Sequence, residues 1–116
     1  MSSWERDIKQ FISYLKIEKG LAENSIFAYQ NDVRKLHDFA ASIRKASTEI
    51  TYEVLKIFIT ELFDLGLSAR SQARIISGIK QFYSFLLLEE RITKDPSELI
   101  EMPNIGRKLP EVLTIE

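Results

Sequence analysis

Apolar residues recur along four stretches of the chain with the three- and four-residue spacing of an amphipathic helix. We expect helices over residues 3–19, 23–42, 52–66 and 69–90, each turning an apolar stripe toward a shared core. No stretch alternates apolar and polar residues between turn signals, which is the pattern of a half-buried strand. The hydrophobic pattern therefore predicts an all-α fold, a bundle of four helices without a sheet.

Single residues mark where these helices begin and end. Thr51 and Ser68 precede the third and fourth helices, and their hydroxyls are suited to accept a hydrogen bond from a first-turn amide. Gly20 is suited to end the first helix, because glycine adopts the left-handed conformation at little cost. Pro96 fits the first position of a further short helical turn, which we expect over residues 97–101.

The C-terminal end of the chain departs from this pattern. Pro103, Gly106 and Pro110 interrupt helical continuity, and the apolar residues around them have few neighbours to bury against. We therefore expect a helical domain over residues 1–102 and an extended linker over residues 103–116. The linker reads as leading toward a further domain, so we expect the chain to be a fragment of a longer protein.

Length and composition place the chain among globular proteins with one domain. It has 116 residues, of which 45% are hydrophobic and 28% charged. No apolar run approaches the roughly 20 residues of a membrane-spanning helix, and the N-terminus lacks the apolar core of a signal peptide. These features predict a cytoplasmic, monomeric chain with no membrane partner.

The sequence offers no constellation for catalysis. It has no cysteine and one histidine, and no cluster of His, Asp and Glu shows the spacing of metal ligands. Its four glycines do not form a phosphate-binding loop. We therefore predict no metal, no cofactor and no catalytic residue in this chain.

Charge is segregated along the chain, although the formal net charge is only −1. Residues 67–94 hold five basic and two acidic residues, a net of +3, whereas residues 48–66 and 95–116 each carry −3. Nucleic-acid-binding domains are often strongly basic overall, so the total charge argues against such a partner. The local fields of the segments matter more than this total.

The fourth predicted helix carries a polar ridge opposite its apolar stripe. At about 100° per residue, Arg70, Arg74, Ser77 and Gln81 fall within about 60° of arc. Two guanidinium groups, a hydroxyl and an amide on one ridge are suited to contact phosphates and base edges. An ordinary solvated helix face has the same pattern. Either way, alanine at Arg70 and Arg74 is expected to disturb folding by no more than about 0.5 kcal/mol.

Several segments, in this order, resemble the N-terminal core-binding domain of tyrosine recombinases, the lambda-integrase family, and its Xer-type members in particular. The segment from Ala22 to Val33 is similar to the family's S-x-N-T-x-x-x-Y-x-x-D-L helix. The other matching segments are Phe11-Ile12-Ser13-Tyr14-Leu15, Glu18-Lys19-Gly20-Leu21, Ser68-Ala69-Arg70-Ser71, residues 74–83, Asp95-Pro96-Ser97-Glu98-Leu99-Ile100 and residues 108–114. The resemblance covers nearly the whole chain and implies a SAM-like, four-helix orthogonal bundle.

The resemblance also implies a function, with DNA binding and catalysis carried out by separate domains. Such a domain forms half of a clamp around double-stranded DNA, together with other recombinase protomers in a synaptic complex. A separate C-terminal domain cleaves the strand with a tyrosine, through a 3′-phosphotyrosyl intermediate and without a cofactor. That domain supplies the catalytic Arg, Lys, His and Tyr, so no catalytic residue is assigned here and this chain alone is not expected to be an enzyme.

In that family, the second and fourth helices of the domain lie against DNA. The positions that the resemblance assigns to DNA contact are Asn24, Ser25, Phe27, Asn31, Arg34, Lys35, Arg70, Ser71, Arg74, Ser77, Lys80 and Gln81. Family members often carry basic residues where this chain has Phe27, Gln30 and Asn31. We therefore expect the chain alone to bind DNA weakly and with little sequence preference.

A second reading is a helical module for protein–protein interaction that does not bind DNA. It would use Phe27 and the acidic third helix as its contact surface. The two readings differ in their dependence on salt, because binding to DNA weakens steeply as salt rises.

Overall fold

The computed structural model describes residues 3–101 of the chain. This part forms four α-helices and a single 3₁₀ turn, without a strand, as the hydrophobic pattern predicts. The elements are α1 (Ser3–Ile17), α2 (Glu23–Ser42), η1 (Ser47–Glu49), α3 (Tyr52–Asp64) and α4 (Ala69–Leu88). No helix within residues 3–101 combines the length and the hydropathy needed to cross a bilayer. The predicted domain boundary at residue 102 and the linker over residues 103–116 lie outside the described residues.

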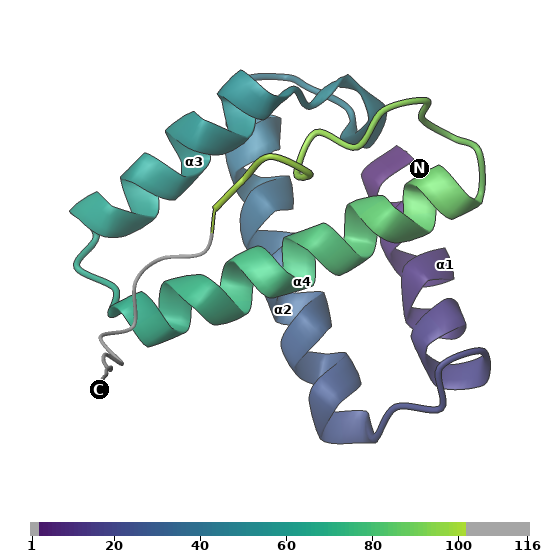
Figure 1. The fold of residues 1–116 in the computed structure, drawn as a ribbon. Coiled ribbons are helices and arrows are strands. Elements are labelled where there is room, and N and C mark those ends of the chain that lie inside the picture. Colours follow the sequence, from purple (N-terminus) through teal and green to yellow (C-terminus); the bar gives the residue numbers. More distant parts are fainter. Residues whose placement is uncertain (1–2, 102–116) are drawn as a thin grey trace, which may run out of the picture.

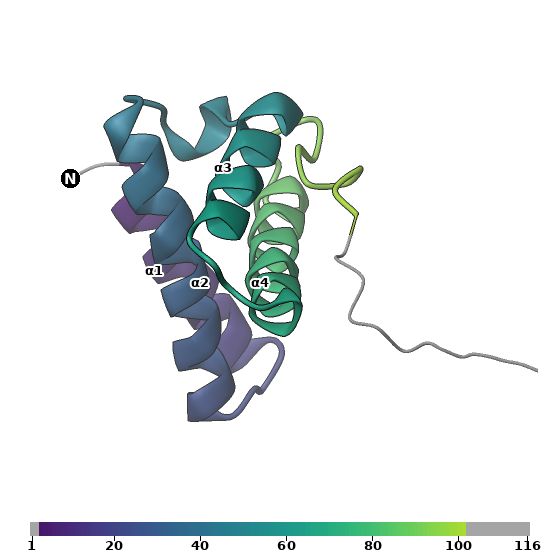
Figure 2. The same cartoon turned by 90° about the vertical axis from the view of Figure 1, so that its left-hand side faces the viewer.

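The helices form two layers. Helices α1 and α2 run antiparallel side by side, and α4 crosses both of them at a steep angle (Figure 1). Helix α3 lies beside α4 in the second layer, which Figure 2 shows edge-on. Helix α4 contacts each of the other three helices, so it is the centre of the bundle. This arrangement confirms the predicted orthogonal bundle.

The predicted helix caps are present. The Thr51 hydroxyl accepts a hydrogen bond from the Val54 amide at 3.3 Å, and the Ser68 hydroxyl accepts one from the Ser71 amide at 3.1 Å. Each cap satisfies an amide that the first helical turn leaves without a backbone partner, which is worth about 1 kcal/mol. Gly20 has a φ of +62° at the turn after α1, a conformation that favours glycine.

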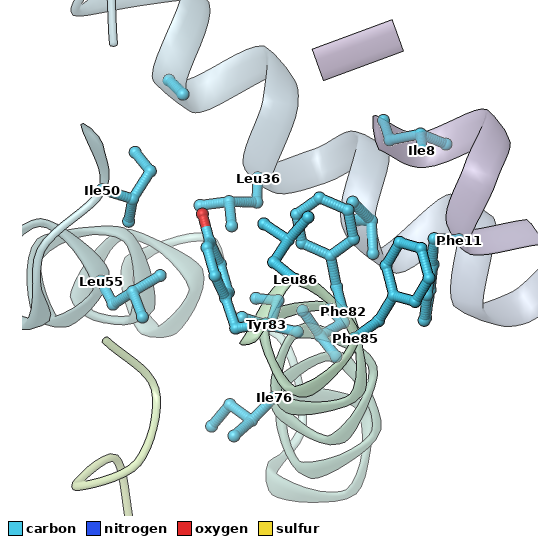
Figure 3. Close-up of a cluster of buried hydrophobic side chains, with 14 of the residues drawn as sticks. Ile8, Phe11, Leu36, Ile50, Leu55, Ile76, Phe82, Tyr83, Phe85 and Leu86 are labelled. Carbon is cyan, nitrogen blue, oxygen red and sulfur yellow. The ribbon is translucent and has the colours of Figure 1, made fainter. Parts of the chain in front are cut away.

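The core is built around the C-terminal half of α4. Phe82, Tyr83 and Leu86 are fully buried, and the ring of Phe82 meets that of Phe11 edge-to-face at 5.4 Å between centroids (Figure 3). Burying each such side chain contributes roughly 1.5–3 kcal/mol to folding. The apolar residues of α4 from Ile75 to Leu86 are buried, as an apolar stripe requires, whereas Leu87 is 41% exposed.

A buried polar cluster ties α1, η1 and the end of α4 together. The carboxylate of Asp7, fully buried, accepts hydrogen bonds from the Ser47 hydroxyl and the Arg91 guanidinium. The Tyr83 hydroxyl donates to the Ser47 carbonyl at 3.0 Å. Burial, and then the negative charge of Asp7, raises the pKa of Tyr83 well above its usual value, so this hydroxyl stays a donor. We call Asp7, Ser47, Tyr83 and Arg91 the Asp7 cluster.

The segment after α4 corrects one prediction. Residues 96–99 form a turn, and no helix is present over residues 97–101. The Asp95 carboxylate accepts from both the amide and the hydroxyl of Ser97, at 2.8 and 2.6 Å. Such Asx turns offer the backbone an alternative to a helical turn, and here the alternative wins. The short η1 was not predicted, since three residues carry no periodicity.

Candidate nucleic-acid interface

Half of the residues of helix α4 are buried, and the others are exposed or half-buried. Among the latter, Arg70, Arg74, Ser77, Gln81, Ser84 and Leu88 follow one another at spacings of four and three residues. We call this line the α4 ridge. Arg70 and Arg74 are exposed, whereas Ser77 and Gln81 are half-buried. The structure therefore brings together the four ridge residues that the helical spacing predicts.

Two further predicted residues of α4 lie away from the ridge. The Ser71 hydroxyl lies 3.2 Å from that of Ser68, within the cap at the start of the helix. Lys80 is about 120° around the helix from Arg74, and its ammonium donates to the Ser97 carbonyl at 2.6 Å. Lys80 thus holds the C-terminal turn against α4. This contact was not visible in the sequence, because it depends on where the turn folds back.

On α2 the predicted residues are all exposed but fall on two lines. Asn24, Asn31 and Lys35 lie within about 40° of one another, on the side of the helix that adjoins Asp32. Phe27 and Arg34 lie on a neighbouring line and border shallow hollows that α2 shares with Ile12 of α1. The second line therefore lies nearer to α1 than the first, although Asn24 borders the same hollow as Phe27.

The start of α2 differs from that of α4. Its N-cap is Ala22, which offers no side-chain hydrogen bond, and Glu23 places a negative charge in the first turn. Ser25 is exposed there. A phosphate near Ser25 would meet free amides but also the repulsion of Glu23, so Ser25 is a weaker candidate than the α4 ridge.

Helices α2 and α4 cross in close contact at Asp32 and Gly78. Asp32 is fully buried, and a Cβ placed on Gly78 would lie 2.8 Å from Oδ2 and 2.9 Å from Cβ of Asp32. No real side chain tolerates such contacts, so glycine is required for this approach. Sequence reasoning missed both residues. The available signals were a glycine in the middle of a helix and an aspartate next to an apolar stripe.

Arg74 lies directly over this crossing. Its Nη1 is 3.3 Å from Oδ1 of Asp32, while the Arg74 side chain remains 54% exposed. Burial raises the pKa of Asp32, and the positive charges of Arg74 and Lys35 partly offset that rise. Arg74 is thus an exposed residue with a buried ion-pair partner, and the sequence showed no sign of that partner.

Lys35 of α2 and Arg74 of α4 both lie close enough to act on Asp32 at the crossing, and Arg70 lies one turn before Arg74. From the crossing, the N-terminal halves of α2 and α4 diverge (Figure 1), and each carries polar residues on its outer side. We call this surface the crossing face: Asn24, Asn31, Lys35, Arg70, Arg74, Ser77 and Gln81. Its cations suit phosphate oxygens, and its amides and hydroxyl suit phosphates or base edges.

Comparison with known proteins identifies relatives over nearly the full chain. Residues 8–90 match the family model described as phage integrase, N-terminal SAM-like domain. Tyrosine recombinase XerD of Staphylococcus epidermidis is 37% identical over 110 residues, which is 94% of this chain and 37% of the relative. XerD of Staphylococcus haemolyticus is 39% identical over 113 residues, or 97% of this chain and 38% of the relative.

A third relative, XerD of Staphylococcus aureus, is 34% identical over 113 residues, again 97% of this chain and 38% of the relative. The chain thus spans just over a third of the length of these relatives. No solved structure shows significant similarity to the chain.

Proposed function

The chain belongs to the phage integrase N-terminal SAM-like domain family, and from that premise we propose that it is the core-binding domain of a site-specific tyrosine recombinase. In this role the crossing face binds duplex DNA. The domain acts in the cytoplasm as one half of a clamp, and a catalytic domain forms the other half. Other recombinase protomers join it on DNA in a synaptic complex.

The observation that carries the proposal is the cationic surface where α2 and α4 cross. Lys35 and Arg74 belong to two helices that are far apart in the sequence, yet both act on Asp32 at the crossing, and Arg70 lies one turn before Arg74. Their charges favour a polyanion, although the chain as a whole carries −1. Phosphate contacts of this kind position a protein on DNA without reading its sequence.

The proposed role leaves the chemistry to residues outside this domain. In tyrosine recombinases, to which the chain is similar, a tyrosine of the catalytic domain attacks a phosphate and forms a 3′-phosphotyrosyl bond. We expect this chain alone to form no covalent adduct with DNA. Duplex binding by the domain alone is expected to be weak, with a Kd of about 10⁻⁴ to 10⁻⁶ M at physiological salt.

The test is the salt dependence of DNA binding in the Arg70→Ala and Arg74→Ala variants. If both guanidinium groups contact phosphates, each loss should weaken binding. Each should also reduce the slope of log K against log salt by roughly one contact. Fluorescence anisotropy of a labelled duplex at several salt concentrations measures both quantities. Circular dichroism should confirm that each variant is folded, because Arg74 is paired with a buried carboxylate.

Lys45→Ala and Lys94→Ala are the matched controls. Both lysines are exposed, and each follows the C-terminal end of α2 or α4, away from the diverging halves of the crossing face. They remove the same charge without touching this surface, so the salt slope should stay unchanged. Equal losses in all four variants would mean that binding follows total charge, and the assignment to the crossing face would be wrong.

The alternative is a protein–protein interaction module, and the exposure of Phe27 favours it. This side chain is 64% exposed and lies on the line of α2 that faces α1 rather than the crossing. A partner that buries Phe27 would bind with little salt dependence. Phe27→Ala would then abolish binding of that partner and leave DNA binding intact.

A further inference from the structure

The carboxylate of Asp32 is buried at the crossing of α2 and α4, immediately behind Arg74. We propose that Asp32 is a positioning residue, which holds the guanidinium of Arg74 at the crossing so that its outer N–H groups meet a DNA phosphate. The proposal rests on the proposed DNA-binding function. It adds a residue that lies beneath the contact surface and orients a side chain of that surface.

Stability alone does not account for this carboxylate. Within the described residues, neither oxygen of Asp32 accepts a hydrogen bond, and the side chain is fully buried. Removing a charged group from water without donors is costly, and an apolar residue of similar size would avoid that cost. The close approach of Gly78 also keeps water from reaching Oδ2 along that side. A costly buried charge beside a binding surface is typical of a functional site.

The geometry of the ion pair leaves Arg74 free to bind a second anion. A guanidinium has five N–H donors in a planar fork, and the approach to Asp32 is made through Nη1 of Arg74, at 3.3 Å. The side chain is exposed over about half its surface, so the other donors reach solvent. Arg70, one turn earlier on the ridge, has no ion-pair partner among residues 3–101. Arg74 is therefore preorganised for binding, whereas Arg70 must lose its rotamer freedom when it binds.

Charge and positioning predict opposite outcomes when Asp32 is neutralised. Asn has nearly the same shape as Asp and fits against Gly78. Asp32→Asn removes a negative charge from behind the crossing face, so charge alone predicts tighter DNA binding. If Asp32 positions Arg74, the same substitution weakens binding, because Arg74 must now be ordered at the expense of binding free energy. The sign of the change separates the two roles.

The experiment measures the affinity of the 116-residue chain for a labelled duplex, with and without Asp32→Asn. We expect about two- to tenfold weaker binding, the factor that corresponds to ordering one long side chain. In the Arg74→Ala background the same substitution should leave binding unchanged or strengthen it, since only the charge effect remains. Unchanged or tighter binding in the Asp32→Asn single variant, while Arg74→Ala weakens it, would overturn the proposal but not the proposed function.

The outcome for Arg74→Ala alone distinguishes the two proposals. If that substitution has no effect on DNA binding, the assignment of Arg74 to the interface fails first, and the role of Asp32 fails with it. Asp38→Asn is the matched control, because Asp38 is also on α2, its side chain is 82% exposed, and it pairs with His37. The control should strengthen binding slightly through its charge, and a loss equal to that of Asp32→Asn would overturn the proposal.

A measurement on the unsubstituted protein tests the proposal without any variant. Nitrogen-15 NMR of arginine side chains reports how fast each guanidinium rotates. We expect slower rotation for Arg74 than for Arg70, and we expect Asp32→Asn to remove the difference. Equal rotation rates in the unsubstituted chain would show that Asp32 does not hold Arg74 and would overturn the proposal.

Discussion

Two fully buried carboxylates, Asp7 and Asp32, each face an arginine, yet their surroundings differ. Asp7 accepts hydrogen bonds from Ser47 and Arg91, and the side chain of Arg91 is itself mostly buried. Asp32 accepts none from the described residues, and its partner Arg74 is half exposed. The first carboxylate is satisfied inside the protein, and the second is only partly compensated.

The difference shows how the same pair of residue types serves two purposes. A fully hydrogen-bonded cluster fixes elements that are distant in the sequence, here α1, η1 and the segment after α4. An incompletely satisfied carboxylate stabilises little, but it orients an arginine that still has donors to offer. The Asp7 cluster belongs to the architecture, and the Asp32–Arg74 pair belongs to the surface that we assign to DNA.

The largest effect is expected where the Asp7 cluster is broken. Arg91→Met leaves a buried carboxylate without its charged partner, and the free energy of unfolding should fall by about 3–5 kcal/mol. Urea denaturation followed by circular dichroism measures this loss. Arg6→Met is the control, because Arg6 approaches the same carboxylate at 3.7 Å but is 58% exposed, so it should cost no more than about 1 kcal/mol. Similar losses from both variants would contradict a special role for Arg91.

A smaller loss is expected at the crossing itself. Gly78→Ala places a Cβ 2.8 Å from Oδ2 of Asp32, so α2 and α4 must separate, at a cost of about 1–3 kcal/mol. Thermal unfolding of the variant checks this. The loss should be partly relieved when Gly78→Ala is combined with Asp32→Ala, which removes the contact with Oδ2 but keeps the Asp32 Cβ 2.9 Å away. Purely additive losses in the double variant would show that the two residues do not compete for the same space.

The smallest effect concerns pH and tests whether Asp32 is incompletely compensated. Burial raises its pKa above the usual 3.8, so the folded protein holds this proton to higher pH than the unfolded chain does. Ionisation of Asp32 therefore costs stability as pH rises from about 3.8 through the raised pKa. Asn does not ionise, so the stability of Asp32→Asn relative to the unsubstituted protein should rise across this window and then level off.

Urea denaturation of both proteins at a series of pH values provides the measurement. A difference in stability that stays constant with pH, or that falls as pH rises, would mean that Asp32 is as well compensated as a fully hydrogen-bonded carboxylate. Asp32 would then not differ from Asp7 in how well its negative charge is compensated.

Much of the fold follows from local pattern. The spacing of apolar residues and the caps at Thr51 and Ser68 predict the four helices, because both signals act within a few residues. Leu87 belongs to the same pattern but is 41% exposed, because it lies at the edge of the apolar stripe of α4. The turn at Asp95 was misassigned because a side-chain hydrogen bond decides between the two local conformations.

The candidate site was predicted less completely, since it depends on how helices meet. Helical spacing placed Arg70 and Arg74 on one ridge, and the structure agrees. Helical spacing could not show that Phe27 and Arg34 lie nearer to α1 than Lys35 does. That depends on where α1 packs against α2, which the sequence of α2 alone does not tell. The contact of Asp32 with Gly78 joins two helices and has no counterpart in either helix alone.

The packing of α4 has a consequence for how the target of such a domain can change over time. The helix that we assign to DNA is also the one that contacts the other three helices, so half of its side chains are committed to the core. Divergence is tolerated best at its exposed or half-buried positions, and those on the α4 ridge are Arg70, Arg74, Ser77, Gln81, Ser84 and Leu88. Selection for a new DNA site can therefore change only a few positions of this helix, while the buried residues beneath them stay the same.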